Sequence, residues 1–222
     1  GANTGGVFGH IFDFSSMPVV GKALFALVAC IILTTVFSSI AGFFMAKYKM
    51  HPFISTMANM LIIFGLVTYA TKGVSFGAID SAIPNMFIPT IGNFPTIIIW
   101  AIVAVVVVWF IWNKTTFGKN MFAVGSNPEA AKVSGVNVMK TTILVHTLAG
   151  AMYGLTGFIE SSRIGSNTAN TGLNYECDAI AACVIGGVSF VGGTGKISGV
   201  VLGVFLLRII FVALNFLSIN MN

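Results

Sequence analysis

Charged side chains are scarce in this chain. Asp, Glu, Lys and Arg make up only 8% of its 222 residues, compared with about 25% in soluble domains. Hydrophobic residues make up 56% of the sequence, and the mean hydropathy is +0.96. This composition excludes an ordinary water-soluble domain and predicts a polytopic membrane protein.

Reactive and metal-binding side chains are also few. The cysteines and histidines number three each and are Cys30, Cys177, Cys183, His10, His51 and His146. The cysteines lack the spacing of metal ligands, so we expect free thiols. No histidine belongs to a zinc motif, no serine lies in a nucleophile elbow, and Gly195-Lys196 lacks the other residues of a P-loop. We therefore expect no metal site, no nucleotide site and no catalytic centre.

Long hydrophobic runs occupy most of the sequence. Five windows approach the ~20 residues needed to cross a bilayer core. They are 23–46, 53–71, 96–112, 141–159 and 197–217. A sixth apolar stretch, 179–191, is short and rich in glycine, which favours a re-entrant or broken helix over a full crossing. The predicted fold is an all-α, polytopic transmembrane helical bundle that forms a single membrane domain over residues 1–222.

The basic residues cluster in two of the connecting loops. The first loop contains Lys47 and Lys49, and the second, 113–140, contains Lys114, Lys119, Lys132 and Lys140 with Glu129 as its sole acid. The positive-inside rule places both loops in the cytoplasm. The other acids lie at or outside the span boundaries, at Asp13, Asp80, Glu160, Glu176 and Asp178. The net charge of +5 thus reflects topology, and nucleic-acid binding is not expected.

A short, strongly capped helix is predicted within the second basic loop. Asn127 can act as its N-cap, and Pro128 suits the first helical position, where a missing N–H costs nothing. Glu129 complements the positive end of the helix dipole, and Gly135 can end the helix in the left-handed conformation. A helix of about two turns is marginal in water by itself. It is either a stray surface helix or a helix that docks on a partner.

Small residues recur at four-residue spacing in the spans. Two such stripes, Ser38-Gly42-Ala46 and Gly150-Gly154 with Gly157 nearby, indicate close packing of membrane helices. A third stripe, Gly195-Gly199-Gly203, continues a denser group of glycines. Glycines so clustered at membrane depth permit non-helical backbone, so we expect the translocation path near 179–199. The candidate path or packing residues are Gly186, Gly187, Gly192, Gly193, Gly195 and Gly199.

Several polar side chains lie at or within the spans. Glu160 and Arg163 are three residues apart and can pair on one helix face, either as a surface ion pair or as part of an outer docking or gating site. Arg208 lies at membrane depth, where an arginine costs about 2.5 to 3.5 kcal/mol. It could reach the interface, pair with another span or line the path. His146 is expected to pack against a neighbouring backbone, and His51 to have a structural role.

The second basic loop resembles the coupling loop of ATP-binding-cassette importer permeases. Glu129-Ala130-Ala131 followed by Gly135 matches the family spacing EAA-x3-G. The wider segments 112–138 and 178–195 are similar to those of galactose and methyl-galactoside permeases, and the likeness extends over nearly the whole chain. The second of these segments is shared by ribose and other sugar permeases. Arg208 departs from the apolar or small residue usual in that branch.

The resemblance implies a multi-pass permease subunit of the bacterial inner membrane that imports a monosaccharide, galactose or methyl-galactoside above all. It implies a homodimer or pair of permease subunits in the lipid bilayer, and a periplasmic sugar-binding protein at the outer face. A cytoplasmic ATPase subunit would use the ATP, and this chain would bind no cofactor. The implied ATPase-coupling residues are Asn127, Pro128, Glu129, Ala130, Ala131 and Gly135. Since the family's chains are longer at both ends, we expect this sequence to be a fragment.

Other functions remain open. A permease for ribose, another sugar or branched-chain amino acids would share the glycine-rich segment, although branched-chain amino acid permeases match the 112–138 loop less closely. A secondary transporter would need an ion site, and the acids all lie at or outside the span boundaries. A structural or adaptor membrane protein would not need a glycine-dense broken segment.

Overall fold

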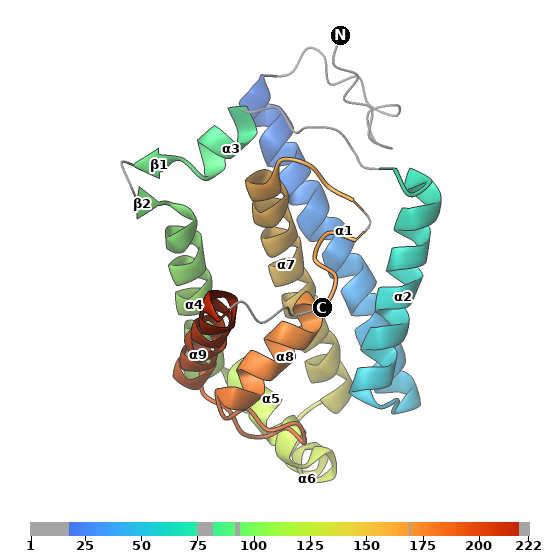
Figure 1. The fold of residues 1–222 in the computed structure, drawn as a ribbon. Helices are drawn as coiled ribbons and strands as arrows, with labels where there is room; N and C mark the ends of the chain where they lie inside the picture. The colour runs from blue at the N-terminus through green and yellow to red at the C-terminus, as the bar shows by residue number, and fades with distance from the viewer. Residues whose placement is uncertain (1–17, 75–81, 92–93, 169, 218–222) are drawn as a thin grey trace. The chain divides into compact units, whose positions relative to one another are not determined.

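The computed structural model describes residues 18–74, 82–91, 94–168 and 170–217. His10, Asp13 and Asp80, which entered the sequence arguments above, lie outside the described residues. Within the described ranges, five helices are long and apolar enough to cross a membrane. They are α1 (Val19–Tyr48), α2 (Pro52–Thr71), α4 (Ile97–Lys114), α7 (Val138–Ile164) and α9 (Ile197–Phe216). Each coincides with one of the five hydrophobic windows, so the prediction of an all-α polytopic membrane protein is confirmed (Figure 1).

Shorter elements connect the long helices. They are α3 (Ala82–Phe87), α5 (Thr116–Ser126), α6 (Pro128–Val133) and α8 (Tyr175–Ile185), and the two-residue strands β1 (Thr90–Ile91) and β2 (Phe94–Pro95). The strands pair antiparallel, with Thr90 opposite Pro95 and Ile91 opposite Phe94. The hydrophobic windows gave no sign of α3 or of this small strand pair, because both are too short to produce a periodic pattern.

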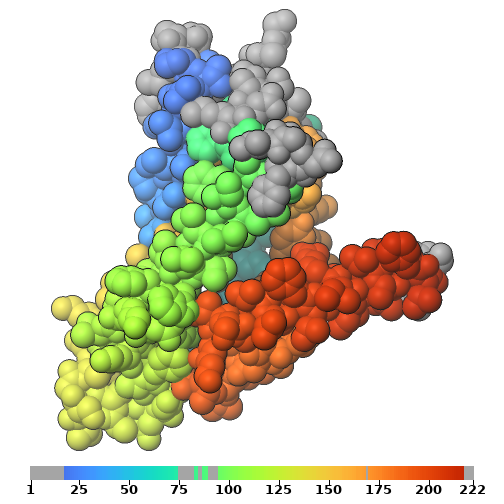
Figure 2. Space-filling model, turned by 90° about the vertical axis from the view of Figure 1, so that its left-hand side faces the viewer, coloured from blue at the N-terminus to red at the C-terminus, as the bar shows by residue number. Residues whose placement is uncertain are grey.

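The surfaces of the long helices are apolar. In α9, Leu202, Phe205 and Ile209 are each more than 60% exposed, and Figure 2 shows the side chains of this helix lying at the surface along its length. Exposed apolar side chains on this scale would be unfavourable in water, but they suit contact with lipid or with further membrane helices. Few side chains of these helices are therefore buried within the described part of the chain.

The structure divides into two compact units. The first comprises Gly1–Ala104 and Thr142–Thr171, and the second Val105–Thr141 and Gly172–Asn222. Two of the long helices, α4 and α7, each begin in one unit and end in the other. The first unit thus contains α1, α2, α3 and most of α7, and the second contains α5, α6, α8 and α9.

In the first unit, α1 packs closely against α7 through small residues. A Cβ atom added at Gly150 would lie 2.8 Å from the Thr34 carbonyl oxygen, and one at Gly154 would lie 2.6 Å from the Ile31 Cα. The Thr34 hydroxyl donates to the Gly150 carbonyl at 2.8 Å, and the Ser38 hydroxyl donates to the His146 carbonyl at 2.7 Å. The predicted small-residue packing is therefore confirmed for these helices.

Two further details concern Gly157 and His146 of α7. Gly157 has no atom within 4 Å of an added Cβ, so it does not extend the contact with α1. The His146 ring lies against Gly42, where an added Cβ would be 2.8 Å from the ring carbon Cγ. The ring nitrogen Nδ1 of His146 is 3.0 Å from the Thr142 carbonyl oxygen. His146 thus packs against the neighbouring helix, as predicted.

The short helix α3 is held within the same unit by aromatic side chains. The Trp100 indole N–H donates to the Phe87 carbonyl at 2.9 Å. The Phe87 ring also meets the Phe158 ring edge to face, with 5.1 Å between their centroids. Trp100 belongs to α4 and Phe158 to α7, so α3 is fixed to both helices.

Candidate functional site

The capped helix predicted in the second basic loop is α6. The Asn127 side-chain oxygen accepts hydrogen bonds from the Glu129 and Ala130 backbone N–H groups, at 3.0 and 3.1 Å. Pro128 occupies the first turn, and Glu129 is the acid of that turn. The predicted cap is confirmed, since the asparagine satisfies two backbone donors that the helix itself cannot.

The end of α6 also matches its prediction. Gly135 has a φ of +84°, a conformation that favours glycine. Its N–H donates to the Lys132 carbonyl, and the Val136 N–H donates to the Ala131 carbonyl, both at 3.0 Å. These bonds close the last turn and send the chain directly towards α7.

Most of α6 faces away from its own chain. Ala131 is buried at 4% exposure, whereas Val133 is 90% exposed. Pro128, Glu129 and Lys132 are exposed as well. A six-residue helix with one anchoring alanine and an exposed valine beside charged groups has a free surface that a partner can cover.

The helix α5 leads into α6, and the sequence analysis missed it. The Thr115 hydroxyl caps α5 by accepting from the Gly118 N–H at 3.2 Å. The Trp112 and Phe122 rings meet edge to face with centroids 5.6 Å apart, which holds α5 against the end of α4. Two signals were available in the sequence: Thr115 as an N-cap, and the helical spacing of Phe117, Met121 and Val124.

A single residue joins α5 to α6. The Asn127 N–H donates to the Ala123 carbonyl at 3.1 Å and so closes α5, while its side chain opens α6. Because Asn127 completes both helices, they meet at a fixed corner without a flexible linker.

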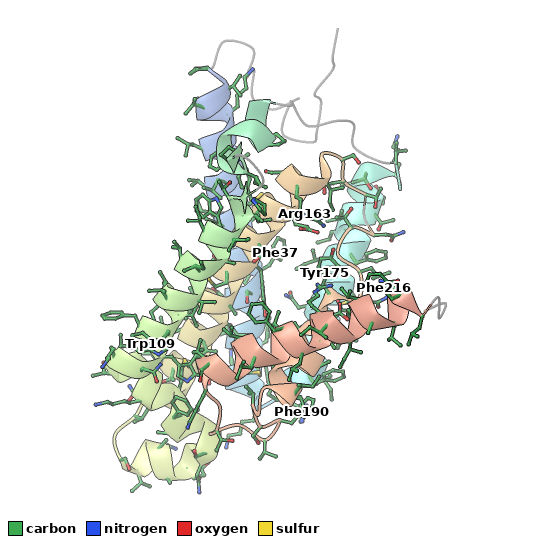
Figure 3. The ribbon with its side chains drawn as sticks, turned by 60° about the vertical axis from the view of Figure 1, so that its left-hand side comes forward. Phe37, Trp109, Arg163, Tyr175, Phe190 and Phe216 are labelled. Carbon is green, nitrogen blue, oxygen red and sulfur yellow. The ribbon has the colours of Figure 1, made fainter. Side chains whose placement is uncertain are left out.

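The apolar stretch 179–191 is half helix and half loop. The helix α8 ends at Ile185, and residues 186–196 form a non-helical loop before α9 begins. Gly187, Gly192 and Gly193 have φ values of +82°, +101° and +74° in this loop. The prediction of a broken segment is therefore confirmed, and the loop is named below as the glycine loop. Phe190 projects from it (Figure 3) and is 78% exposed.

The helices on either side of the glycine loop touch backbone to backbone. A Cβ atom added at Gly199 would collide with the Gly186 carbonyl oxygen, and one at Gly186 with the Gly199 carbonyl oxygen. A Cβ at Gly203 would lie 2.8 Å from the Gly186 N and would also collide with the Ala182 carbonyl oxygen. These glycines hold α8 and α9 together. Gly195 lies outside this contact, in the loop, where an added Cβ would be 3.2 Å from a Val188 methyl.

The glycine loop also meets the end of α5. A Cβ atom added at Gly125 would lie 2.7 Å from the Gly193 N, and one at Gly192 would lie 2.7 Å from the Gly125 carbonyl oxygen. A Cβ at Gly193 would lie 2.7 Å from the Ser126 Cα. Figure 1 shows the loop between α8 and α9 passing beside α5 and α6. Gly192 and Gly193 thus contact residues about 65 positions earlier in the sequence, which directly precede Asn127.

The remaining candidate residues are Glu160, Arg163 and Arg208. Glu160 and Arg163 pair near the end of α7, with Arg163 Nη2 and Nε 2.6 and 2.9 Å from the two carboxylate oxygens. Figure 3 shows Arg163 at that end of the helix. Arg208 is exposed halfway along α9, with its guanidinium 5.8 Å from the Phe211 ring centroid. Its position on the helix is opposite that of Gly199, so it faces away from α8.

The three cysteines lie on two helices, Cys30 on α1 and Cys177 and Cys183 on α8. Cys30, Cys177 and Cys183 are free. Among residues 18–74, 82–91, 94–168 and 170–217, no three side chains of His, Cys, Asp or Glu gather as metal ligands would. Glu176 and Asp178 lie in the first turn of α8 instead of a loop, where their charges favour the positive end of the helix dipole.

Comparison with known proteins gives consistent matches. A family model described as "Branched-chain amino acid transport system / permease component" matches residues 4–222. The galactose/methyl galactoside import permease protein MglC of Treponema pallidum is 44% identical over 95% of this chain and 41% of its own length. The protein of the same name from Escherichia coli is 43% identical over 94% of this chain and 63% of its own length.

More distant relatives carry other sugar names. The L-arabinose transport system permease protein AraH of Escherichia coli is 37% identical over 81% of this chain and 55% of its own length. No solved structure matches the chain. The chain spans less than two thirds of the length of these curated relatives.

Proposed function

The chain belongs to the family of branched-chain amino acid transport system permease components, and we propose that it forms the membrane-spanning part of an ATP-driven importer for galactose or methyl-galactoside. It is a multi-pass protein of the inner membrane, as its five apolar helices and its family indicate. The observation that carries the proposal is α6, a rigidly capped and largely exposed helix at the family's coupling position.

The partners follow from this role. A cytoplasmic ATPase subunit binds α6 through its exposed side chains, and ATP is used there, because this chain has no nucleotide motif of its own. A periplasmic sugar-binding protein delivers the substrate at the outer face, where the Glu160–Arg163 pair is a candidate docking or gating element. A second permease subunit, most simply a second copy of this chain, completes the path.

The proposed mechanism is alternating access. Closure of the ATPase on ATP moves α6, and the Asn127 corner passes that movement to α5 without a flexible linker. The glycine loop between α8 and α9 supplies non-helical backbone beside α5, at the cytoplasmic end of the proposed path. The remaining candidate path residues, Gly186 and Gly199, keep the two helices together as they move.

The names of the relatives support galactose or methyl-galactoside as the substrate. The relatives with 43% and 44% identity are named for galactose and methyl galactoside, whereas the arabinose relative is 37% identical. The family description names branched-chain amino acids, so a permease for branched-chain amino acids is the second candidate function. The galactoside function is favoured because four relatives named for galactose and methyl galactoside are 42% to 44% identical to this chain.

The test is uptake into proteoliposomes that contain the full-length permease with its ATPase and binding protein. We expect labelled galactose to enter only with ATP on the ATPase side, and methyl-galactoside to compete. ATP-driven uptake of ribose or of a branched-chain amino acid instead would retain the importer class and correct the substrate. Uptake that is indifferent to ATP would refute the proposed function.

A further inference from the structure

The contact between the end of α5 and the glycine loop is made largely by backbone atoms, with the Ser126 side chain lying against Gly193. The two segments approach each other closely at Gly125, Gly192 and Gly193. A Cβ added at any of these glycines would lie 2.7 Å from a backbone atom of the opposite segment. Side-chain contacts can adjust by changing rotamers, but a contact between backbones has no such freedom. The two segments can therefore move only together or by separating.

This contact continues on both sides into rigid structure. On one side, Gly125 precedes the Asn127 corner by two residues, and that corner fixes α5 to α6. On the other side, the glycine loop leads to α8 and α9, which are held together by Gly186, Gly199 and Gly203. An unbroken series of close contacts thus runs from α6 to the α8–α9 pair, all within the second unit.

We propose that Gly125, Gly192 and Gly193 form the joint through which movement of α6 reaches α8 and α9. These residues are positioning residues for transport, because the role proposed for them is exerted through α6 and the membrane helices. The inference rests on the proposed function, because it assigns to this joint the step that follows docking of the ATPase. It predicts that loosening the joint separates ATP hydrolysis from transport.

Gly125→Ala is the sharpest probe of the joint. Gly125 lies in a helix, where alanine is the stronger helix former, so the substitution adds no backbone strain of its own. Its Cβ would meet the Gly193 N, and α5 and the glycine loop would have to move apart. Gly65→Ala and Gly157→Ala are matched controls, because both glycines are helical and an added Cβ meets nothing within 4 Å.

The first measurement is the amount of sugar transported per ATP hydrolysed by the full-length permease with its ATPase and binding protein. In Gly125→Ala we expect this ratio to fall about tenfold, within the range of coupling energies between distant sites. Binding of the ATPase and basal ATP hydrolysis should remain near the wild-type level, and both controls should keep the wild-type ratio. A protein that was merely misfolded would lose binding, hydrolysis and transport together.

A second measurement tests the joint in the otherwise wild-type complex, so it does not depend on the assembly of Gly125→Ala. Spin labels are placed at Lys119 on α5 and at Val191 in the glycine loop, which is 91% exposed, with the native cysteines replaced. In the otherwise wild-type complex we expect one narrow distance distribution with and without ATP, because the joint moves as one body. A distance that changes with ATP would overturn the inference, and so would normal coupling in Gly125→Ala. Absence of ATP-driven uptake by the wild type would instead overturn the proposed function.

Discussion

The most direct prediction about α6 concerns its N-cap, Asn127. Its side-chain oxygen accepts two backbone hydrogen bonds, at 3.0 and 3.1 Å, at the start of a helix of only six residues. Replacing such a cap with alanine costs about 1 kcal/mol of helix stability. A helix this short has little stability to spare, so Asn127→Ala should leave α6 partly unfolded before the ATPase binds.

The size of the effect follows from the population of folded α6. If the isolated helix is half formed in the wild type, losing ~1 kcal/mol lowers its folded fraction about threefold, and a helix that was already mostly unfolded loses about fivefold. Binding of the ATPase should weaken by the same factor, because only the folded helix binds. Binding can be measured by titrating labelled ATPase onto the permease in nanodiscs.

A matched substitution separates the cap from the side chain itself. Asn127→Asp retains an acceptor oxygen and adds a negative charge that the helix N-terminus favours. It should therefore bind the ATPase as well as the wild type does. Equal affinity for Asn127→Ala and the wild type would refute the reasoning, since α6 would then be held by something other than its cap.

Three further predictions concern other parts of the chain. Glu129→Arg reverses a charge in the first turn of α6 and should abolish coupled uptake but leave membrane insertion intact, as uptake and membrane fractionation will report. Gly154→Ala forces a Cβ against Ile31 and should lower the stability of the first unit by about 1 to 3 kcal/mol, whereas Gly157→Ala should not, as thermal unfolding can measure. Glu160→Gln removes an ion pair whose arginine is 54% exposed, so the free energy of unfolding should change by less than about 1 kcal/mol. If this variant binds the periplasmic protein more weakly than the wild type does, the pair has a docking role.

The sequence was sufficient for features that depend on local chemistry. Hydrophobic length located all five long helices, because a bilayer requires about 20 apolar residues whatever the rest of the fold does. The cap at Asn127 and the turn at Gly135 were also predictable, since each is determined by residues within one or two turns. The Glu160–Arg163 pair belongs to the same class, as residues three apart on a helix are neighbours.

Features that depend on contacts between distant segments could not be derived in this way. The contact of Gly125 with Gly192 and Gly193 joins parts of the chain that no spacing rule connects. The extent of α7 was underestimated for a different, local reason: the hydrophobic window ended at 159, but the helix continues to Ile164 through polar residues. Glu160 and Arg163 are polar and fall outside a hydropathy window, yet their pairing suits a helix that reaches beyond the hydrocarbon core.

The glycines show how much of the mechanism depends on such distant contacts. A glycine within a helix costs roughly 1 kcal/mol relative to alanine wherever it occurs, so the sequence gives Gly65, Gly125 and Gly157 the same cost. In the structure only Gly125 has a backbone against it, and only there does the absence of a side chain permit something that alanine would prevent. In the first unit, Gly150 and Gly154 join two helices that pack along one face. In the second unit the corresponding contacts connect the exposed helix α6, through α5, with α8 and α9, an arrangement that suits the proposed transmission of movement.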